Sequence, residues 1–125
     1  MKPSTILSPA FNTEVHNLMS AYRKIQNSYG VSFPISLHKL EMRHIDVFVA
    51  AQQYELAKKQ RSADNNYRNP FNIQYRLATK TFKQTESEFY TAYAALRKTI
   101  DRITNALSEI HYSTFRQVQK LALTK

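Results

Sequence analysis

Cysteine, tryptophan, glycine and proline are scarce or missing in this chain of 125 residues. It has no Cys and no Trp, one Gly and four Pro. The missing Cys excludes a disulfide framework and any thiolate site, and it fits a reducing compartment. Sheets need turn residues such as Gly and Pro at each chain reversal, so their scarcity predicts an all-α protein. The length is that of one domain, which we expect to span residues 1–125.

Long apolar runs and catalytic motifs are missing as well. No stretch reaches the roughly 18 apolar residues of a membrane-spanning helix, and residues 1–8 lack the apolar core of a secretion signal. The only glycine, Gly30, cannot form a phosphate-binding loop, and no serine lies in a nucleophile elbow. Four histidines are present without metal-ligand spacing, namely His16, His38, His44 and His111. We therefore expect a cytoplasmic, non-enzymatic protein with no cofactor or metal.

Capping residues and the spacing of apolar side chains predict three long helices, over residues 9–29, 37–61 and 72–111. In the first helix, Ser8 is a typical N-cap, Pro9 suits the first helical position, and Gly30 can end the helix. Ser36 can cap the second helix in the same way as Ser8. Beyond the third helix, residues 114–125 can form a short fourth one.

The predicted helix at 37–61 has two apolar rows, whereas a surface helix has one. The first row is Leu37, Leu40, Val47, Ala51 and Tyr54, and the second is Ile45, Phe48, Val49 and Leu56. A helix that is apolar on two sides is expected between two neighbours. We therefore predict an elongated antiparallel bundle of the three long helices, with 37–61 in the centre. A turn near residues 62–71 then sets Leu40 beside Tyr93.

The third predicted helix carries a regular apolar row, which we call the seam. It consists of Phe89, Tyr93, Leu96, Ile100, Ile103, Leu107 and Ile110, at alternating steps of four and three residues. These steps are the heptad pattern of a coiled coil. In the predicted register, the first two helices leave the part from Ile100 to Ile110 uncovered. Burying four such side chains contributes roughly 1.5–3 kcal/mol each. Either residues 113–125 fold back over them, or a second chain forms a homo-oligomer through the seam.

The most informative feature of the sequence is a basic segment between residues 58 and 83. It holds seven cations and one acid, Asp64, and so contributes +6 of the net charge of +9. Aromatic residues, among them Tyr67, Phe71 and Tyr75, lie between the charges, and the turn at Asn69-Pro70 falls inside the segment. Folding the second and third helices about this turn brings the cations to one end of the bundle, which we call the basic tip. Its candidate partner-binding residues are Lys58, Lys59, Arg61, Tyr67, Arg68, Phe71, Tyr75, Arg76, Lys80 and Lys83.

Two functions of different classes fit the basic tip. An interaction or adaptor protein would use it to bind an acidic protein surface, and would self-associate through the seam. A nucleic-acid-binding accessory protein would place the same cations on phosphates, with Tyr67, Phe71 or Tyr75 stacked on bases. The pI near 9.9 favours nucleic acid, whereas the seam favours the interaction protein. We rank the interaction protein first.

Overall fold

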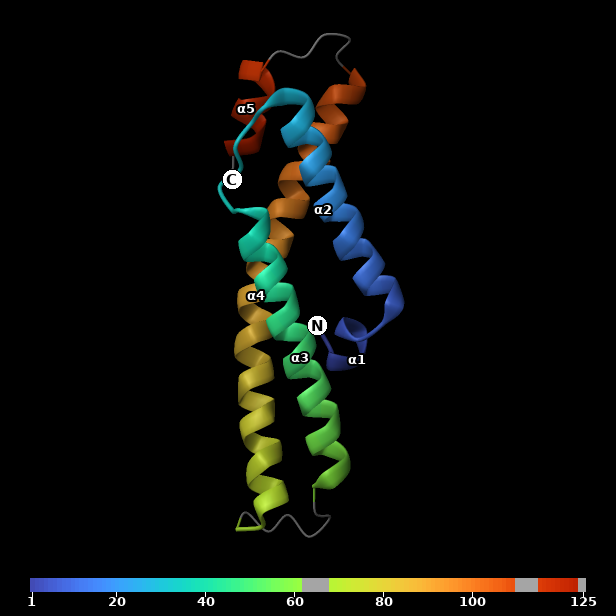
Figure 1. Cartoon of the computed structure of the whole chain (residues 1–125), viewed down its shortest axis with the longest axis vertical. Helices are drawn as coiled ribbons and strands as arrows, with labels where there is room; N and C mark the ends of the chain where they lie inside the picture. Colours follow the sequence, from blue (N-terminus) through green and yellow to red (C-terminus); the bar gives the residue numbers. More distant parts are fainter. Residues whose placement is uncertain (62–67, 110–114, 124–125) are drawn as a thin grey trace.

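The computed structural model describes residues 1–61, 68–109 and 115–123, and every regular element in these ranges is an α-helix. The elements are α1 (Pro3–Ile6), α2 (Pro9–Tyr29), α3 (Leu37–Gln60), α4 (Pro70–Glu109) and α5 (Phe115–Leu123). The helices pack against one another in an elongated molecule (Figure 1). The prediction of an all-α fold is therefore confirmed for the described residues. The short helix α1 was not predicted.

The helix ends follow from local chemistry. At the start of α2, the Ser8 hydroxyl accepts a hydrogen bond from the Phe11 amide at 3.2 Å, and Ser36 caps α3 in the same way. Gly30 ends α2 with a φ of 66°, in the left-handed region that favours glycine, and its N–H donates to the Gln26 carbonyl at 2.7 Å. These caps fix where the chain can change direction.

Four rings meet where α2, α3 and α4 come together, and we call this cluster the aromatic junction. Phe11 of α2 contacts Phe89 and Tyr93 of α4, with ring centroids 5.9 and 5.8 Å apart. His44 of α3 lies 5.7 Å from Phe89 and 6.4 Å from Phe11. Phe89 is fully buried. The edge-to-face and tilted arrangements are those that aromatic pairs prefer, so the junction sets how the three long helices meet.

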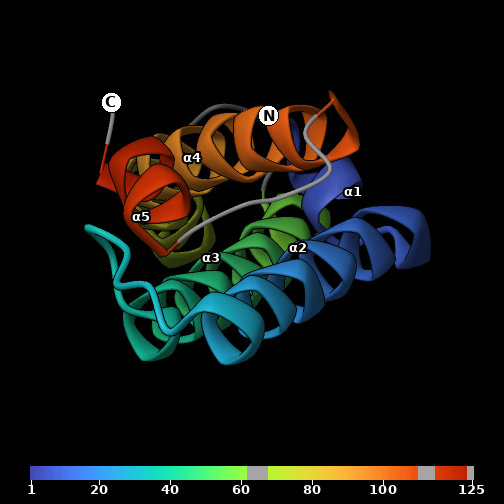
Figure 2. The same ribbon diagram turned by 90° about the horizontal axis from the view of Figure 1, so that it is seen from above.

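The molecule has two unlike halves, one on each side of the aromatic junction (Figure 1). Toward the basic tip, α3 and α4 run side by side as a two-helix hairpin, and the short helix α1 lies against α3 with Ile6 fully buried. Toward the other end, α2 lies along the second half of α4, and residues of both helices line a shared groove. In this half α5 also packs on α4 (Figure 2).

The prediction that 37–61 lies between two neighbours is wrong for its second apolar row. Ile45 is 54% exposed and Leu56 55% exposed, Val49 is exposed as well, and Phe48 is half-buried. The first row is largely buried against α4. The path of α2 leaves the tip half of α3 uncovered and covers α4 instead, which accounts for the exposure of Leu56 (Figure 1). Ile45 stays exposed although it lies beside His16 and Arg23 of α2. The spacing of apolar residues reveals that a face is apolar, but not which element covers it.

The seam is buried inside a single chain. Phe89, Tyr93, Leu96, Ile100 and Ile103 are buried, Leu107 is half-buried, and Ile110 lies outside the described residues. Val118 and Ala122 of α5 belong to the same core. The Gln119 side-chain amide holds α5 to the segment before α3, because it donates to the Ser32 carbonyl at 2.8 Å and accepts from the Ser32 amide at 3.0 Å. Of the two predicted covers, the structure thus shows the folded-back C-terminal segment, over residues 115–123. The described seam residues are covered within one chain, so the structure does not support them as a self-association surface.

The burial of the seam predicts unequal costs for two identical substitutions. Ile103→Ala should lower the free energy of unfolding by about 2–5 kcal/mol, because it leaves a cavity in a fully buried site. Ile45→Ala removes the same atoms from an exposed site and should change it by about 0.5 kcal/mol or less. Urea denaturation of dilute protein measures both values. Equal losses at the two positions would contradict this assignment of the core.

Candidate functional site

The basic tip is built by the end of α3 and the start of α4. Pro70 begins α4, where its missing N–H costs nothing. Asn69 caps the helix: its side-chain oxygen accepts from the Phe71 amide at 2.9 Å, and its carbonyl accepts from the Asn72 and Ile73 amides at 3.0 Å. The first turn of α4 is therefore held by its own capping residue, and it presents the tip side chains on a fixed helix.

Tyr75 at the tip is engaged within the fold. Its hydroxyl lies 3.2 Å from that of Tyr54, and the guanidinium carbon of Arg61 lies 4.8 Å from the centre of its ring. The hydrogen bond from Tyr54 lowers the pKa of Tyr75, and the same bond raises the pKa of Tyr54. This contact ties the end of α3 to the start of α4. Arg61 therefore covers one face of the Tyr75 ring, and Tyr54 engages its hydroxyl.

The other predicted tip residues lie at the end of α3, just before α4 and along roughly the first four turns of α4. Tyr67 lies outside the described residues. Phe71 is 49% exposed. The cations of the tip are all exposed, and they are Lys58, Lys59, Arg61, Arg68, Arg76, Lys80 and Lys83. Arg68 and Arg76 also have interaction partners within the chain. The tip is thus a solvent-facing cluster of positive charge.

Two aliphatic residues of the tip were not identified from the sequence. Ile73 is 41% exposed and Leu77 61% exposed, and both lie on the side of α4 that faces away from α3. Lys80 follows at the same helical spacing. We call Ile73, Arg76, Leu77, Lys80 and Lys83 the α4 mixed face. This face could have been recognised in the sequence, because Ile73 and Leu77 are four residues apart and lie off the row of core positions.

Two histidines that are distant in sequence come together between α2 and α3. The rings of His16 and His44 meet edge to face, with centroids 6.3 Å apart. The Asn12 side-chain amide donates to the backbone carbonyl of Ser8 at 2.9 Å, so its oxygen is left to accept from His44 Nε2, also at 2.9 Å. Burial lowers the pKa of His44, and the neighbouring His16 lowers it further. Among the described residues, no three His, Cys, Asp or Glu side chains are placed to hold a metal ion.

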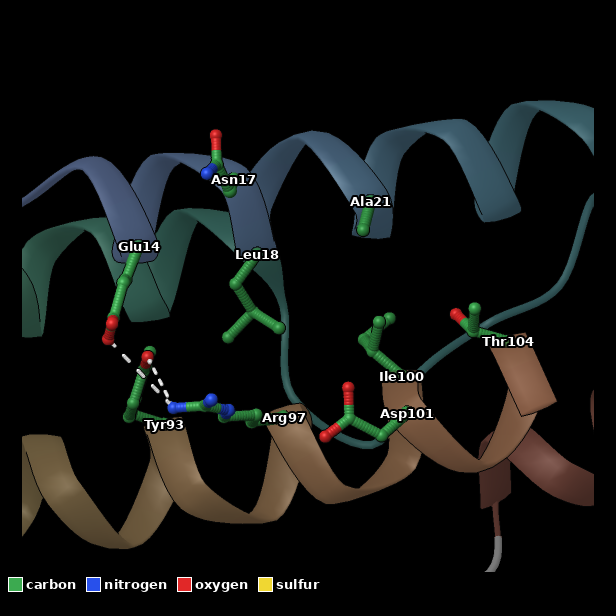
Figure 3. Close-up of a pocket in the computed structure, with 9 residues that line it drawn as sticks. All are labelled: Glu14, Asn17, Leu18, Ala21, Tyr93, Arg97, Ile100, Asp101 and Thr104. Atoms are coloured by element: carbon green, nitrogen blue, oxygen red, sulfur yellow. Dashed lines mark hydrogen bonds and ion pairs between the residues drawn. The ribbon is translucent and has the colours of Figure 1, made fainter.

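A groove of about 320 Å³ lies between α2 and α4 (Figure 3). Arg97 points into it, with its Nη1 3.9 Å from a carboxylate oxygen of Glu14 and 3.5 Å from the Tyr93 hydroxyl. Burial raises the pKa of Tyr93. Leu18 and Ile100 add apolar surface to the groove. Because the opposite charges compensate each other, the groove offers polar contacts and not an activated catalytic group.

Comparison with known proteins finds no relative of this chain. No protein-family model, curated protein or solved structure matches it. Among the described helices, none has both the length and the apolar content that a membrane-spanning segment needs. The function is therefore argued from the surface of the molecule, where the basic tip has the strongest chemical character.

The environment of His44 predicts how the free energy of unfolding depends on pH. Since its pKa is lowered in the folded state, the unfolded chain binds more protons as the pH falls below about 6.5. The free energy of unfolding should therefore be highest above about pH 6.5, and it should decrease as the pH falls toward the pKa of His44 in the folded state. His44→Gln should make this decrease smaller. Denaturation at several pH values measures it, with His38→Gln at an exposed site as the control. An equal decrease in the wild type and in His44→Gln would refute this role of His44.

Proposed function

We propose that this chain is a non-enzymatic interaction protein that binds an acidic protein surface through the basic tip. The observation that carries the proposal is the α4 mixed face, where exposed Ile73 and Leu77 lie among the cations. Cations attract an acidic partner over a distance and orient it. Aliphatic side chains then give the complex apolar contact, which phosphate groups cannot provide.

The position of the cations supports a role beyond helix stability. Lys58 and Lys59 lie in the last turn of α3, where a positive charge complements the helix dipole. Lys80 and Lys83 lie in the interior of the long helix α4, where the dipole gives them no such stabilisation. No acid is present between Phe71 and Thr85, and the nearest one, Glu86, lies three residues after Lys83. Its carboxylate is engaged by the N-terminal amine of Met1 at 2.8 Å. Binding of an external acidic group accounts for this arrangement.

The long helices suit a protein that presents a binding surface at one end. We propose that α2, α3 and α4 behave as an elongated antiparallel bundle with coiled-coil character, as the heptad spacing of the seam suggests. Such a bundle holds its tip at a fixed distance from its other end. The role is that of an adaptor, in which α3 and α4 carry the binding residues and the rest of the chain keeps them rigid.

A nucleic-acid-binding function is the second candidate, and Phe71 favours it. Its exposed ring beside Lys and Arg residues is the kind of platform on which a base stacks. The engagement of Tyr75 with Tyr54 and Arg61 weighs against it, because Arg61 already covers one face of a ring that was predicted to stack on bases. The aliphatic pair on the α4 mixed face also has no role in phosphate binding. The acidic protein partner therefore ranks first.

Charge reversal at the tip tests the proposal. The double variant Lys80→Glu, Lys83→Glu should lose its protein partners in pull-downs from cell lysate, because it replaces two exposed cations by acids. Its melting temperature should stay close to that of the wild type, since neither side chain is in the core. The matched control Lys24→Glu, Lys98→Glu makes the same charge change at exposed positions away from the tip and should keep the partners.

Treatment of the lysate with nuclease separates the two candidate functions. For an acidic protein partner, the wild type should capture the same proteins with and without nuclease. If nucleic acid is the ligand, nuclease removes the captured material, and the logarithm of the affinity for a single-stranded oligonucleotide falls linearly with the logarithm of salt concentration. That result would overturn the first proposal in favour of the second. Partners retained by the double variant would exclude both functions for the α4 mixed face.

A further inference from the structure

Two tyrosine rings, Tyr54 of α3 and Tyr75 of α4, lie against each other near the basic tip. Their ring centroids are 5.6 Å apart, and their hydroxyl oxygens are 3.2 Å apart. Phe82 supports the Tyr54 ring from the core, with centroids 5.8 Å apart, and Arg61 lies over the Tyr75 ring. Both tyrosines are half-buried, so small molecules in the solvent can reach them. We call Tyr54 and Tyr75 the tyrosine pair.

The composition of the chain directs oxidation toward tyrosine. Cysteine and tryptophan, which compete with tyrosine for a one-electron oxidant, are both missing, whereas eight tyrosines are present. Methionine reacts mainly by taking up oxygen to form the sulfoxide. Tyr22 and Tyr93 are buried, and the aromatic rings next to them are those of phenylalanines, which have no hydroxyl to oxidise. The tyrosine pair is therefore the place in the described structure where two oxidisable rings meet.

We propose that the tyrosine pair is a site of oxidative modification, at which a small one-electron oxidant joins the two rings as dityrosine. Each phenol gives one electron to the oxidant and its hydroxyl proton to water, which leaves two neutral tyrosyl radicals. A carbon ortho to one hydroxyl then bonds to the corresponding carbon of the other ring, and the hydrogens on these two carbons move to the oxygens. The pair loses two electrons and two protons in all, and two equivalents of oxidant are reduced.

The geometry of the tyrosine pair resembles that of the product. In dityrosine the two hydroxyls are on the carbons next to the new bond, so they lie side by side and share a hydrogen bond. The hydroxyls of Tyr54 and Tyr75 already share one. The ring planes are tilted by 41°, and the rings of a biaryl are also twisted against each other. A rotation of the two half-buried side chains is therefore enough to bring the ortho carbons together.

The surroundings of Tyr75 ease the loss of its proton. A tyrosyl radical is neutral, so the phenol has to release a proton when it loses an electron. The hydrogen bond from Tyr54 lowers the pKa of Tyr75, and the positive charge of Arg61 lowers it further. We therefore expect Tyr75 to be oxidised first, with Tyr54 beside it as the second ring.

The link is a covalent staple in a chain that has no cysteine for a disulfide. It joins residues 21 positions apart and closes the turn between α3 and α4. Such a cross-link stabilises a protein mainly by restricting the unfolded chain. It acts in the half of the molecule where α3 and α4 pack mainly against each other. The inference goes beyond the proposed function, because it needs no partner.

Brief oxidation of the dilute full chain with photo-oxidised tris(bipyridine)ruthenium and persulfate tests the inference. The mass of the monomeric product should be lower than that of the untreated chain by the mass of two hydrogen atoms. After trypsin digestion, the peptides of residues 44–58 and 69–76 should be linked, and their only tyrosines are Tyr54 and Tyr75. In a mixture of isotope-labelled and unlabelled chains, both linked peptides should carry the label or neither, because the link lies within one chain. The linked monomer should also melt at a higher temperature than the untreated protein.

Three variants and an unfolded sample serve as controls. Tyr54→Phe and Tyr75→Phe should each lose the link, because phenylalanine keeps the ring but has no hydroxyl to oxidise. Tyr90→Phe removes an exposed tyrosine outside the pair and should keep the link. A folded chain that stays unlinked under conditions that oxidise the tyrosines of the urea-unfolded chain would overturn the inference. Equal yields of the link in the folded and unfolded chains would do the same, as would linked peptides of which only one carries the label.

Discussion

The arrangement of the whole chain depends on the aromatic junction around Phe89. Phe11, His44 and Tyr93 surround this ring, so one buried residue joins the three long helices. On one side of the junction, α2 and α5 bury the second half of α4. On the other side, α3 and α4 pack only against each other and against part of α1. Because two helices can bury just the faces that they turn to one another, the outer faces of this half remain in solvent.

The exposed surfaces of the hairpin are a consequence of this division. Two helices alone bury little apolar surface and gain little stability from it. The ends of the hairpin therefore depend on specific polar and aromatic contacts. Asn69 caps α4, and Tyr54, Tyr75 and Arg61 tie the two helices together near the tip. With the inner faces fixed in this way, the outer residues of α3 and α4 contribute little to the stability of the chain. They are free to take part in recognition, which is why the proposed partner binding uses this half of the molecule.

Features that are decided within one helix could be predicted from the sequence. Contacts that depend on how two helices cross could not. The caps at Ser8, Gly30 and Ser36 could be identified because capping is decided within one helical turn. The seam was identified by its spacing, and the folded-back C-terminal segment was one of its two predicted covers. The part that α2 covers was not predicted, because the path of α2 is set by the aromatic junction. The pairs His16 with His44 and Glu14 with Arg97 come from different helices, so no spacing along the chain reveals them. The engagement of Tyr75 was missed for the same reason.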